Sequence, residues 1–433
     1  MASIKEKLTS IEQIPSFVYL CKWLVIAALI GALAGSASAA LLYSLEWATN
    51  YREANKWIIA LLPIGGLIVG LVYHYYGSSV VKGNNQLLEE FHSPHKIIPF
   101  RMAPLVLFGT VMTHLFGGSA GREGSAVQMG GAIADQFTKW FKLKKEDRKI
   151  VIIIGVSAGF ASVFGTPLAG AIFALEVMIL GRMRYDALLA SVLGGIIADY
   201  VCKLWPVHHT HYGVELVPEI TPTTLFYAII AGLIFGLGGL AFSKATHFFT
   251  IVFKKLNYPP LRPFIGGAVV ALAVYLIGTT KYIGLGVPTI VDAFNMELPW
   301  YDFAAKLLFT AFTLGAGFKG GEVTPLFYIG ATLGNALIWF VPLPTELLAG
   351  MGFVAVFAAA TNTPIACTIM AIELFGGEGA VYFGVACVVA YMFSGHSGIY
   401  SSQIVGSPKH FLFGVDKGKT LAAIDSFRKK KSS

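Results

Sequence analysis

The chain has few charged residues: Asp, Glu, Lys and Arg together make up 13% of its 433 residues. Soluble globular proteins carry roughly 25% of such residues, so this scarcity excludes an ordinary soluble domain. Hydrophobic residues, in contrast, make up 55% of the chain. The composition therefore predicts a protein that lies in a lipid bilayer.

Cysteine is scarce as well. The chain has four cysteines, and no two of them form a CxxC pair: Cys21, Cys202, Cys367 and Cys387. This spacing excludes the usual zinc sites and a disulfide framework. We expect neither a metal nor a cofactor.

The N-terminal segment 1–20 lacks the apolar run and the small-residue cleavage site of a secretory signal. Ile4, Leu8, Ile11 and Ile14 recur there at helical spacing. This pattern predicts an amphipathic helix that lies on the membrane surface, on the cytoplasmic side.

Long apolar runs follow at 24–47 and 58–76. About 20 residues of helix span the ~30 Å hydrocarbon layer, so both runs are long enough to cross it. Several other apolar runs are shorter or interrupted by glycine and proline. Such interruptions are tolerated in a membrane only where protein or water surrounds the backbone, which predicts half-helices and re-entrant segments.

The formal net charge is +8, and the basic residues concentrate in four short segments: 139–149, 182–184, 254–262 and 428–431. Short loops rich in Lys and Arg mark the cytoplasmic face of a membrane protein. Contact with anionic lipid headgroups is enough to explain the charge, so we expect no nucleic-acid partner. Both termini are assigned to the cytoplasm.

An internal repeat organises the chain. The segment that begins Thr166-Pro167 and ends Glu176-Val177 reappears as Thr363-Pro364 to Glu373-Leu374. The same alignment places Gly155 on Gly352 and Phe160 on Phe357, and a small shift places 121–130 on 321–330. Two membrane halves with breaks at equivalent positions predict an inverted-repeat transporter, with its substrate site between the halves.

The repeat sets the expected domains: an N-terminal helix 1–20, repeats at 21–206 and 224–403, a connection 207–223, and a C-terminal tail 404–433. The connection holds His208, His209 and His211. Three nearby histidines can bind a metal, but without a fixed scaffold or a neighbouring cysteine we do not expect one here.

Several helices are predicted to begin inside the membrane, after Gly83, Gly124 and Gly321. A helix N-terminus presents unpaired N–H groups and about half a positive charge, which makes it an anion site. The alternative is that each glycine break only allows close helix packing. Three breaks combined with the repeat favour an anion-selective centre.

Glu123 lies at the second of these breaks, in Gly121-Arg122-Glu123-Gly124-Ser125. A charged residue at membrane depth costs several kcal/mol unless it meets a partner or a wet pathway. A deprotonated Glu123 would occupy an anion site, and a protonated one would leave it. This interpretation makes Glu123 both the gate and the proton carrier; the alternative is a structural pair with Arg122.

These motifs resemble the CLC family of anion channels and proton-coupled anion antiporters, over residues 22–402. The resemblance rests on Gly121-Arg122-Glu123-Gly124, on 165–170 and on the second filter loop at 320–325. It implies an all-α membrane protein built from two inverted repeats, and a homodimer with one pathway in each subunit. It also implies that Glu123 is the gating glutamate. The implied anion contacts are Tyr400 and the backbones of Arg122, Gly124, Glu322 and Val323.

Several residues depart from the pattern of the chloride members. Asn84 stands where the family's anion-contacting serine is found, although a shift of one residue would give that place to Asn85. The other departures are Ser125 in place of proline, Glu322 and Thr324 in place of apolar residues, and Val177 in place of the internal proton-transfer glutamate. This combination resembles the bacterial fluoride/proton antiporters of the family.

Fluoride is small and strongly hydrated, so its dehydration requires strong hydrogen-bond donors. Asn84 offers an amide N–H₂ group and Thr324 offers a hydroxyl. A protonated Glu322 would also donate, and would provide the proton route that Val177 cannot. The alternative for Glu322 is an outward-facing carboxylate paired with Lys319.

Other polar and aromatic residues carry weaker claims. Glu176 and Glu373, at equivalent repeat positions, are expected to cap helices or to reach the membrane surface rather than to transport ions. His114 is expected to be a hydrogen-bonded packing residue. Phe318 and Phe327 would line the pathway or, as is usual for aromatic residues in such a fold, pack in the core.

The sequence therefore predicts a fluoride/proton antiporter in the inner or plasma membrane of a bacterium, and not an enzyme. A chloride/proton antiporter or a passive chloride channel is the nearest alternative. A membrane-embedded enzyme with Glu123, His114 and Glu322 as acid–base groups is a further alternative, but the sequence has no nucleophile or cofactor motif to support it. A cation transporter is disfavoured by the helix N-termini. The helices expected at the dimer interface are 166–179, 185–203, 346–360 and 364–375.

Overall fold

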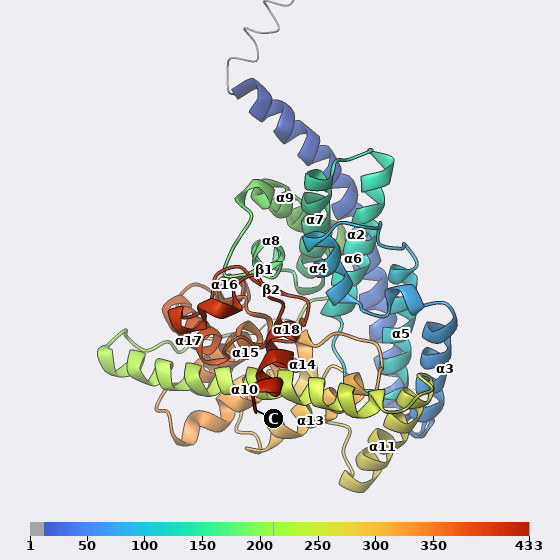
Figure 1. Ribbon diagram of the computed structural model, residues 1–433. Helices are drawn as coiled ribbons and strands as arrows, with labels where there is room; N and C mark the ends of the chain where they lie inside the picture. Colours follow the sequence, from blue (N-terminus) through green and yellow to red (C-terminus); the bar gives the residue numbers. More distant parts are fainter. Residues whose placement is uncertain (1–12, 211, 433) are drawn as a thin grey trace, which may run out of the picture.

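The computed structural model describes residues 13–210 and 212–432. Residues 1–12 of the expected surface helix, and His211, therefore lie outside the described residues. Residues 13–20 begin a longer helix, α2 (Gln13–Ala54). In the described chain, α2 and α10 (Pro222–Lys254) are the longest helices, and they run at a steep angle to one another (Figure 1).

In the first half of the chain, α2 is followed by further helices and one short strand. Its elements are η1 (Lys56–Leu61), α3 (Leu62–Tyr75), η2 (Ser78–Val80), α4 (Asn84–His92), α5 (Met102–Phe116), α6 (Glu123–Trp140), α7 (Lys145–Phe164), α8 (Pro167–Glu176), β1 (Ile179–Leu180), η3 (Tyr185–Ala187) and α9 (Leu188–Lys203).

The second half is also built of helices with one short strand. After α10 its elements are α11 (Leu261–Ile277), α12 (Val287–Asn295), α13 (Asp302–Gly315), α14 (Val323–Ala336), η4 (Leu337–Trp339), α15 (Thr345–Thr361), α16 (Pro364–Phe375), α17 (Ala380–Phe393), β2 (Ile404–Val405), η5 (Phe411–Asp416) and α18 (Leu421–Ser432).

Only some of these helices are long enough to cross a bilayer. By length and composition, four helical stretches of the described residues qualify: Ser16–Ala54, Lys56–Tyr75, Tyr185–Lys203 and Pro222–Lys254. The other apolar helices, α5, α8, α11 and α14 to α17 among them, are shorter than the ~20 residues that span ~30 Å. The all-α membrane fold with broken helices, predicted from the interrupted apolar runs, is confirmed.

Equivalent glycines bring neighbouring helices of each half into close contact. A Cβ on Gly130 of α6 would stand 2.2 Å from the carbonyl oxygen of Gly155 on α7. A Cβ on Gly330 of α14 would stand 2.0 Å from the carbonyl oxygen of Gly352 on α15. Since no side chain fits at either crossing, each pair of backbones packs directly. The two crossings occupy the positions that the sequence repeat aligns.

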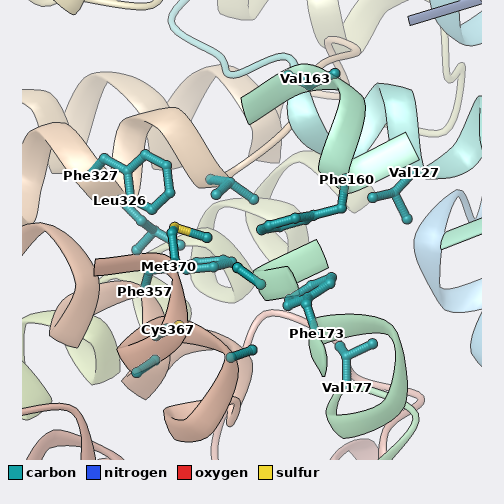
Figure 2. Close-up of a cluster of buried hydrophobic side chains, with 14 of the residues drawn as sticks. Val127, Phe160, Val163, Phe173, Val177, Leu326, Phe327, Phe357, Cys367 and Met370 are labelled. Atoms are coloured by element: carbon teal, nitrogen blue, oxygen red, sulfur yellow. The ribbon is translucent and has the colours of Figure 1, made fainter. Parts of the chain in front are cut away.

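The two halves meet in an aromatic core. Figure 2 shows Phe160 and Phe173 of the first half pointing toward Phe327 and Phe357 of the second. The repeat-equivalent pair Phe160 and Phe357 lies with ring centroids 6.1 Å apart, and Phe327 stacks on Phe353 at 3.9 Å. Such ring pairs contribute about 0.5–1.5 kcal/mol each beyond the area they bury. Phe327 is therefore mainly a core residue.

Glu176 and Glu373 cap each other's helices. The Glu176 carboxylate, at the end of α8, accepts hydrogen bonds from the amides of Ile365 (3.2 Å) and Ala366 (2.9 Å) in the first turn of α16. The Glu373 carboxylate, on α16, accepts from Leu168 (3.0 Å) and Ala169 (2.8 Å) in the first turn of α8. Carboxylates at helix N-termini satisfy amides that otherwise have no partner. Of the two roles expected for these residues, capping and reaching the membrane surface, the contacts show capping.

The described part of the C-terminal tail, 404–432, packs back onto the first half. β2 pairs in parallel with β1, through Ile179 with Ile404 and Leu180 with Val405. Leu421 and Ile424 of α18 join Leu180 and Val405 in a small buried cluster. The tail is therefore anchored to the membrane part rather than extended from it.

One part of the expected dimer interface is wrong. In α15, every residue from Leu347 to Thr361 is buried within the subunit, so 346–360 cannot present a surface to a partner. The sequence could not separate this helix from its neighbours because it is apolar on all sides. The adjacent helix α17 exposes Val381 and Val388 instead.

Candidate functional site

The N-terminal ends of three helices lie close to one another near the boundary between the two repeats. α4 begins at Asn84, and its N-cap Gly83 has a φ of 56°, a conformation that suits glycine. α6 begins at Glu123 and α14 at Val323. α6 thus begins at Glu123, earlier than the start after Gly124 that the sequence predicts, so the carboxylate lies in the first turn of the helix.

The two glycine breaks pair with each other. Gly121 N donates to Gly321 O at 2.6 Å, and Gly321 N donates to Gly121 O at 2.7 Å, which forms an antiparallel bridge. Antiparallel pairing of equivalent loops is the arrangement expected where two repeats are related by a two-fold axis. The bridge brings the first turns of α6 and α14 together.

Glu123 is fully buried, and its carboxylate reaches across to α14. Its Oε2 accepts from the amide of Thr324 at 3.0 Å and from the amide of Arg122 at 3.1 Å. Its Oε1 accepts from the hydroxyl of Thr324. The carboxylate therefore occupies the positive end of α14, as a bound anion would. From the second glycine loop, the backbone amide that donates to the Glu123 carboxylate is that of Thr324, the neighbour of Glu322 and Val323, whose backbones the sequence predicts as anion contacts.

Arg122 is a secondary partner of this carboxylate. Its Nε lies 3.5 Å from Glu123 Oε1, which is longer than a hydrogen bond. The shorter contacts all come from the amides and hydroxyl described above. The position of Glu123 is therefore set mainly by the first turns of the two helices rather than by a pair with Arg122.

Asn84 and Glu322 converge on Gly124. From the place where a Cβ on Gly124 would stand, Asn84 Nδ2 is 3.1 Å away and Glu322 Oε2 is 3.4 Å away. Both Asn84 Oδ1 and Glu322 Oε2 are buried without a hydrogen-bond partner among the described residues. Buried polar atoms of this kind are uncommon, and they mark a place where a ligand or water completes the contacts.

Lys319 does not pair with Glu322 in the described chain. Its ammonium lies over the ring of Tyr73, 4.2 Å from the centroid, in a cation–π contact. The alternative of an outward-facing Glu322–Lys319 ion pair is therefore wrong.

Asn85 and Gln403 hold the loop that carries Tyr400, a role that no pattern in the sequence indicated. Asn85 Oδ1 accepts from the amide of Ser402 at 2.9 Å. Gln403 Nε2 donates to Val177 O at 2.9 Å. Since Asn85 is engaged with this loop, Asn84 is the asparagine that faces Gly124. A single chain read without relatives cannot separate two adjacent asparagines.

A large vestibule leads to these residues. It has a volume of about 690 Å³, and Asn84, Glu322 and Tyr400 lie on its wall together with the basic Lys82, Lys254 and Arg262. Glu123 does not line it, but lines a second, small cavity with Arg122, His209 and Thr324. Glu123 therefore stands between the two cavities.

The two cavities are lined by residues near opposite ends of α10. Lys254, at the end of α10, lines the vestibule, whereas the start of α10 follows the connection that holds His209. A helix of 33 residues rises about 50 Å, more than the ~30 Å hydrocarbon layer, so α10 is long enough to cross it. The Arg184–Glu146 contact of 3.4 Å also brings two of the four basic segments together.

The remaining sequence candidates lie around this centre. Ser125 Oγ is 2.6 Å from Thr110 Oγ1 on α5, so it faces the helix behind the filter loop. His114 has both ring nitrogens next to carbonyl oxygens, those of Thr110 (2.8 Å) and Ala120 (3.0 Å), which is the hydrogen-bonded packing role expected for it. Val177 is buried and lines a small apolar cavity with Asn84 and Tyr400.

Comparisons with known proteins agree with this geometry. The family model described as "Voltage gated chloride channel" matches residues 65–395. The chain is 53% identical over 417 residues to the "Chloride/fluoride channel protein" of Pseudomonas syringae pv. tomato, covering 95% of this chain and 92% of the relative. It is 27% identical to the "H(+)/Cl(-) exchange transporter ClcA" of Cronobacter sakazakii, over 81% of each chain.

A solved structure described as a CLC-type fluoride/proton antiporter is similar as well. It superposes with a TM-score of 0.86 and 35% sequence identity, covering 89% of this chain and 98% of that structure. Members of the family are transporters and channels rather than enzymes. The paired glycine loops, the buried Glu123 and these similarities lead to one conclusion: the chain is an ion-transport membrane protein of the CLC family, with a solved fluoride/proton antiporter among its similar structures.

Proposed function

We propose that the protein is a fluoride/proton antiporter that exports cytoplasmic fluoride in exchange for inward-moving protons. The 53% identity to a protein named for chloride and fluoride supports this proposal, as does the likeness to a solved fluoride/proton antiporter. We further propose that it lies in the bacterial inner or plasma membrane, with the basic face and both termini in the cytoplasm.

The observation that carries the proposal is the position of the Glu123 carboxylate on the amides of Arg122 and Thr324, between the vestibule and the small cavity. A carboxylate and a halide compete for the same donors. When Glu123 takes up a proton it loses the charge that holds it there, and fluoride from the vestibule takes its place. One side chain thereby links the movement of an anion to that of a proton.

Selectivity for fluoride is assigned to Asn84, Glu322 and Thr324. Asn84 Nδ2 and Glu322 Oε2 face the same point beside Gly124. A protonated Glu322 donates a hydrogen bond to fluoride and can release its proton to the vestibule after the ion has passed. Strong donors at this point offset the cost of dehydrating a small anion. Chloride, which is larger and less strongly hydrated, would not require donors of this strength. Tyr400 completes the anion contacts from the vestibule side.

The protein is proposed to act as a homodimer with one pathway in each subunit. The apolar faces of α8, α9, α16 and α17 form the proposed interface, α17 replacing the buried α15. Leu168, Ile196, Ile365 and Val388 are exposed on these helices in the single chain. Crosslinking of cysteines placed at Ile196 and Val388 tests this surface, and a monomer in lipid would contradict it.

The direct test of function uses purified protein in liposomes, with a fluoride electrode and a pH electrode in the same chamber. Fluoride efflux should drive proton uptake in a fixed ratio, and chloride should support little exchange. Equal exchange of chloride would establish the alternative, a chloride/proton antiporter. Anion efflux with no proton movement would establish a passive channel.

A further inference from the structure

The small cavity beside Glu123 has polar walls. It has a volume of about 20 Å³, and its polar lining comes from Arg122, Glu123, His209, Thr210, Tyr212 and Thr324. A cavity holds one water molecule when this volume exceeds roughly 10–15 Å³ and several polar groups surround it. The space between His209 and Glu123 is therefore suited to a single bridging water.

His209 is held in one orientation on the wall of this cavity. It lies in the connection between α9 and α10, is half-buried, and has its Nε2 3.0 Å from the carbonyl oxygen of Ser162. A carbonyl oxygen only accepts, so Nε2 must carry the hydrogen. In the neutral ring this leaves the lone pair on Nδ1 available to bind a proton.

Burial lowers the pKa of His209, and the positive charges of Arg122 and Lys203 lower it further, whereas the Ser162 carbonyl and Asp199 act in the opposite direction. The other titratable group on the cavity wall besides Glu123 and Arg122 is Tyr212, which does not ionise near neutral pH. Apart from Glu123 itself, His209 is thus the described lining residue that titrates nearest to physiological pH.

We propose that His209 relays protons between the solution on the face opposite the vestibule and Glu123. This inference rests on the proposed antiport. Nδ1 takes a proton from outer water and forms an imidazolium. The imidazolium passes a proton through one water molecule to a Glu123 oxygen. The ring returns to its neutral form and the carboxylate becomes a neutral acid, so charge and protons balance.

The relay explains why a histidine lines the same cavity as the buried gating residue Glu123. Glu123 is fully buried, and Arg122 lies beside it as a fixed charge that cannot shuttle protons. Because the pKa of His209 is lowered, the imidazolium forms only below the ordinary value of about 6.5. Exchange should therefore speed up as the outer solution becomes acidic, with the midpoint below that value.

The test compares His209→Gln with His208→Gln in liposomes, at outer pH values from about 5 to 8, around the ordinary range of histidine. Gln keeps an N–H donor for Ser162 O but cannot carry a proton. His208, the exposed neighbour, supplies the matched control. His209→Gln should slow proton-coupled exchange by about 100-fold, the lower end of what a positioned acid or base contributes, and should flatten the pH profile. His208→Gln should retain both.

A second variant separates a relay from a structural role. In His209→Ala, added imidazole should restore the rate and the pH profile, because it supplies the missing base. A wild-type rate and pH profile in His209→Gln would overturn the relay, as would failure of imidazole to restore His209→Ala. Neither result would affect the proposed antiport, which fails only if the wild-type protein does not exchange fluoride for protons.

Discussion

Gly121 and Gly321 exchange two backbone hydrogen bonds, of 2.6 and 2.7 Å, across the boundary between the repeats. This bridge holds the first turns of α6 and α14 close enough for the Glu123 carboxylate to reach Thr324. The position of the gate therefore depends on two residues that carry no side chain. Their role is to let two backbones meet inside the membrane.

Replacing Gly321 with alanine should disrupt the centre. A Cβ there would stand 2.7 Å from the amide nitrogen of Gly124, a distance that atoms do not tolerate. Gly321→Ala should reduce fluoride exchange at least about tenfold, equivalent to ~1.4 kcal/mol in the barrier. Gly377→Ala is the control, since no atom lies within 4 Å of its added Cβ. Equal exchange rates for the two variants would refute the steric role of the bridge.

Thr324 should act through its hydroxyl. Thr324→Val keeps the shape and the backbone amide but removes the O–H donor to Glu123. A hydrogen bond to a charged group contributes about 1.5–3 kcal/mol, so a loss of roughly tenfold or more in exchange is expected. Thr324→Ser should retain most activity. Thr332→Val provides a control on the same helix, where the hydroxyl donates to the backbone carbonyls of Tyr328 (2.7 Å) and Ile329 (3.4 Å) and does not touch Glu123.

Glu176 and Glu373 should affect stability and not coupling. Glu176→Ala and Glu373→Ala each remove two acceptors from the start of the opposite helix. Each should lower the stability of the detergent-solubilised protein by about 1–2 kcal/mol. The fluoride-to-proton ratio should stay unchanged. The exposed Glu378, changed to alanine, should leave the melting temperature unaltered. An altered ratio in either cap variant would assign it a transport role.

The tail should hold the Tyr400 loop in place. The amides of Leu421 and Ala422 donate to the carbonyls of Gln403 and Ser401, each at 3.0 Å. Ile424→Asp places a charge in the buried cluster that anchors α18, whereas Ala423→Asp places one on its exposed side. The first variant should lower both the melting temperature and the apparent fluoride affinity. If Ile424→Asp matches Ala423→Asp in transport, the tail does not position Tyr400.

Much of the fold could be predicted because it depends on patterns within one chain. The repeat aligned Gly121 with Gly321 and Phe160 with Phe357, and both pairs are in contact. The place of Glu176 near a helix end predicted capping or contact with the membrane surface, and the structure shows capping. These features are local in sequence or are related by the repeat, so composition and spacing carry them.

Other features depend on contacts between distant segments, which spacing does not encode. The burial of α15 is set by the helices that surround it and not by its own uniformly apolar sequence. The contact of Asn85 with Ser402 joins residues more than 300 positions apart. The place of His209 beside Glu123 likewise depends on how the connection folds over the end of α7.

We propose that the Glu123 carboxylate both blocks the anion path and carries the proton. Uphill fluoride transport driven by a pH gradient, compared between wild type and Glu123→Gln in liposomes, tests this proposal directly. Gln has nearly the same shape but does not titrate. Wild-type protein should accumulate fluoride against its gradient, and the variant should only let it equilibrate. Proton-driven accumulation by Glu123→Gln at the wild-type level would contradict the claim.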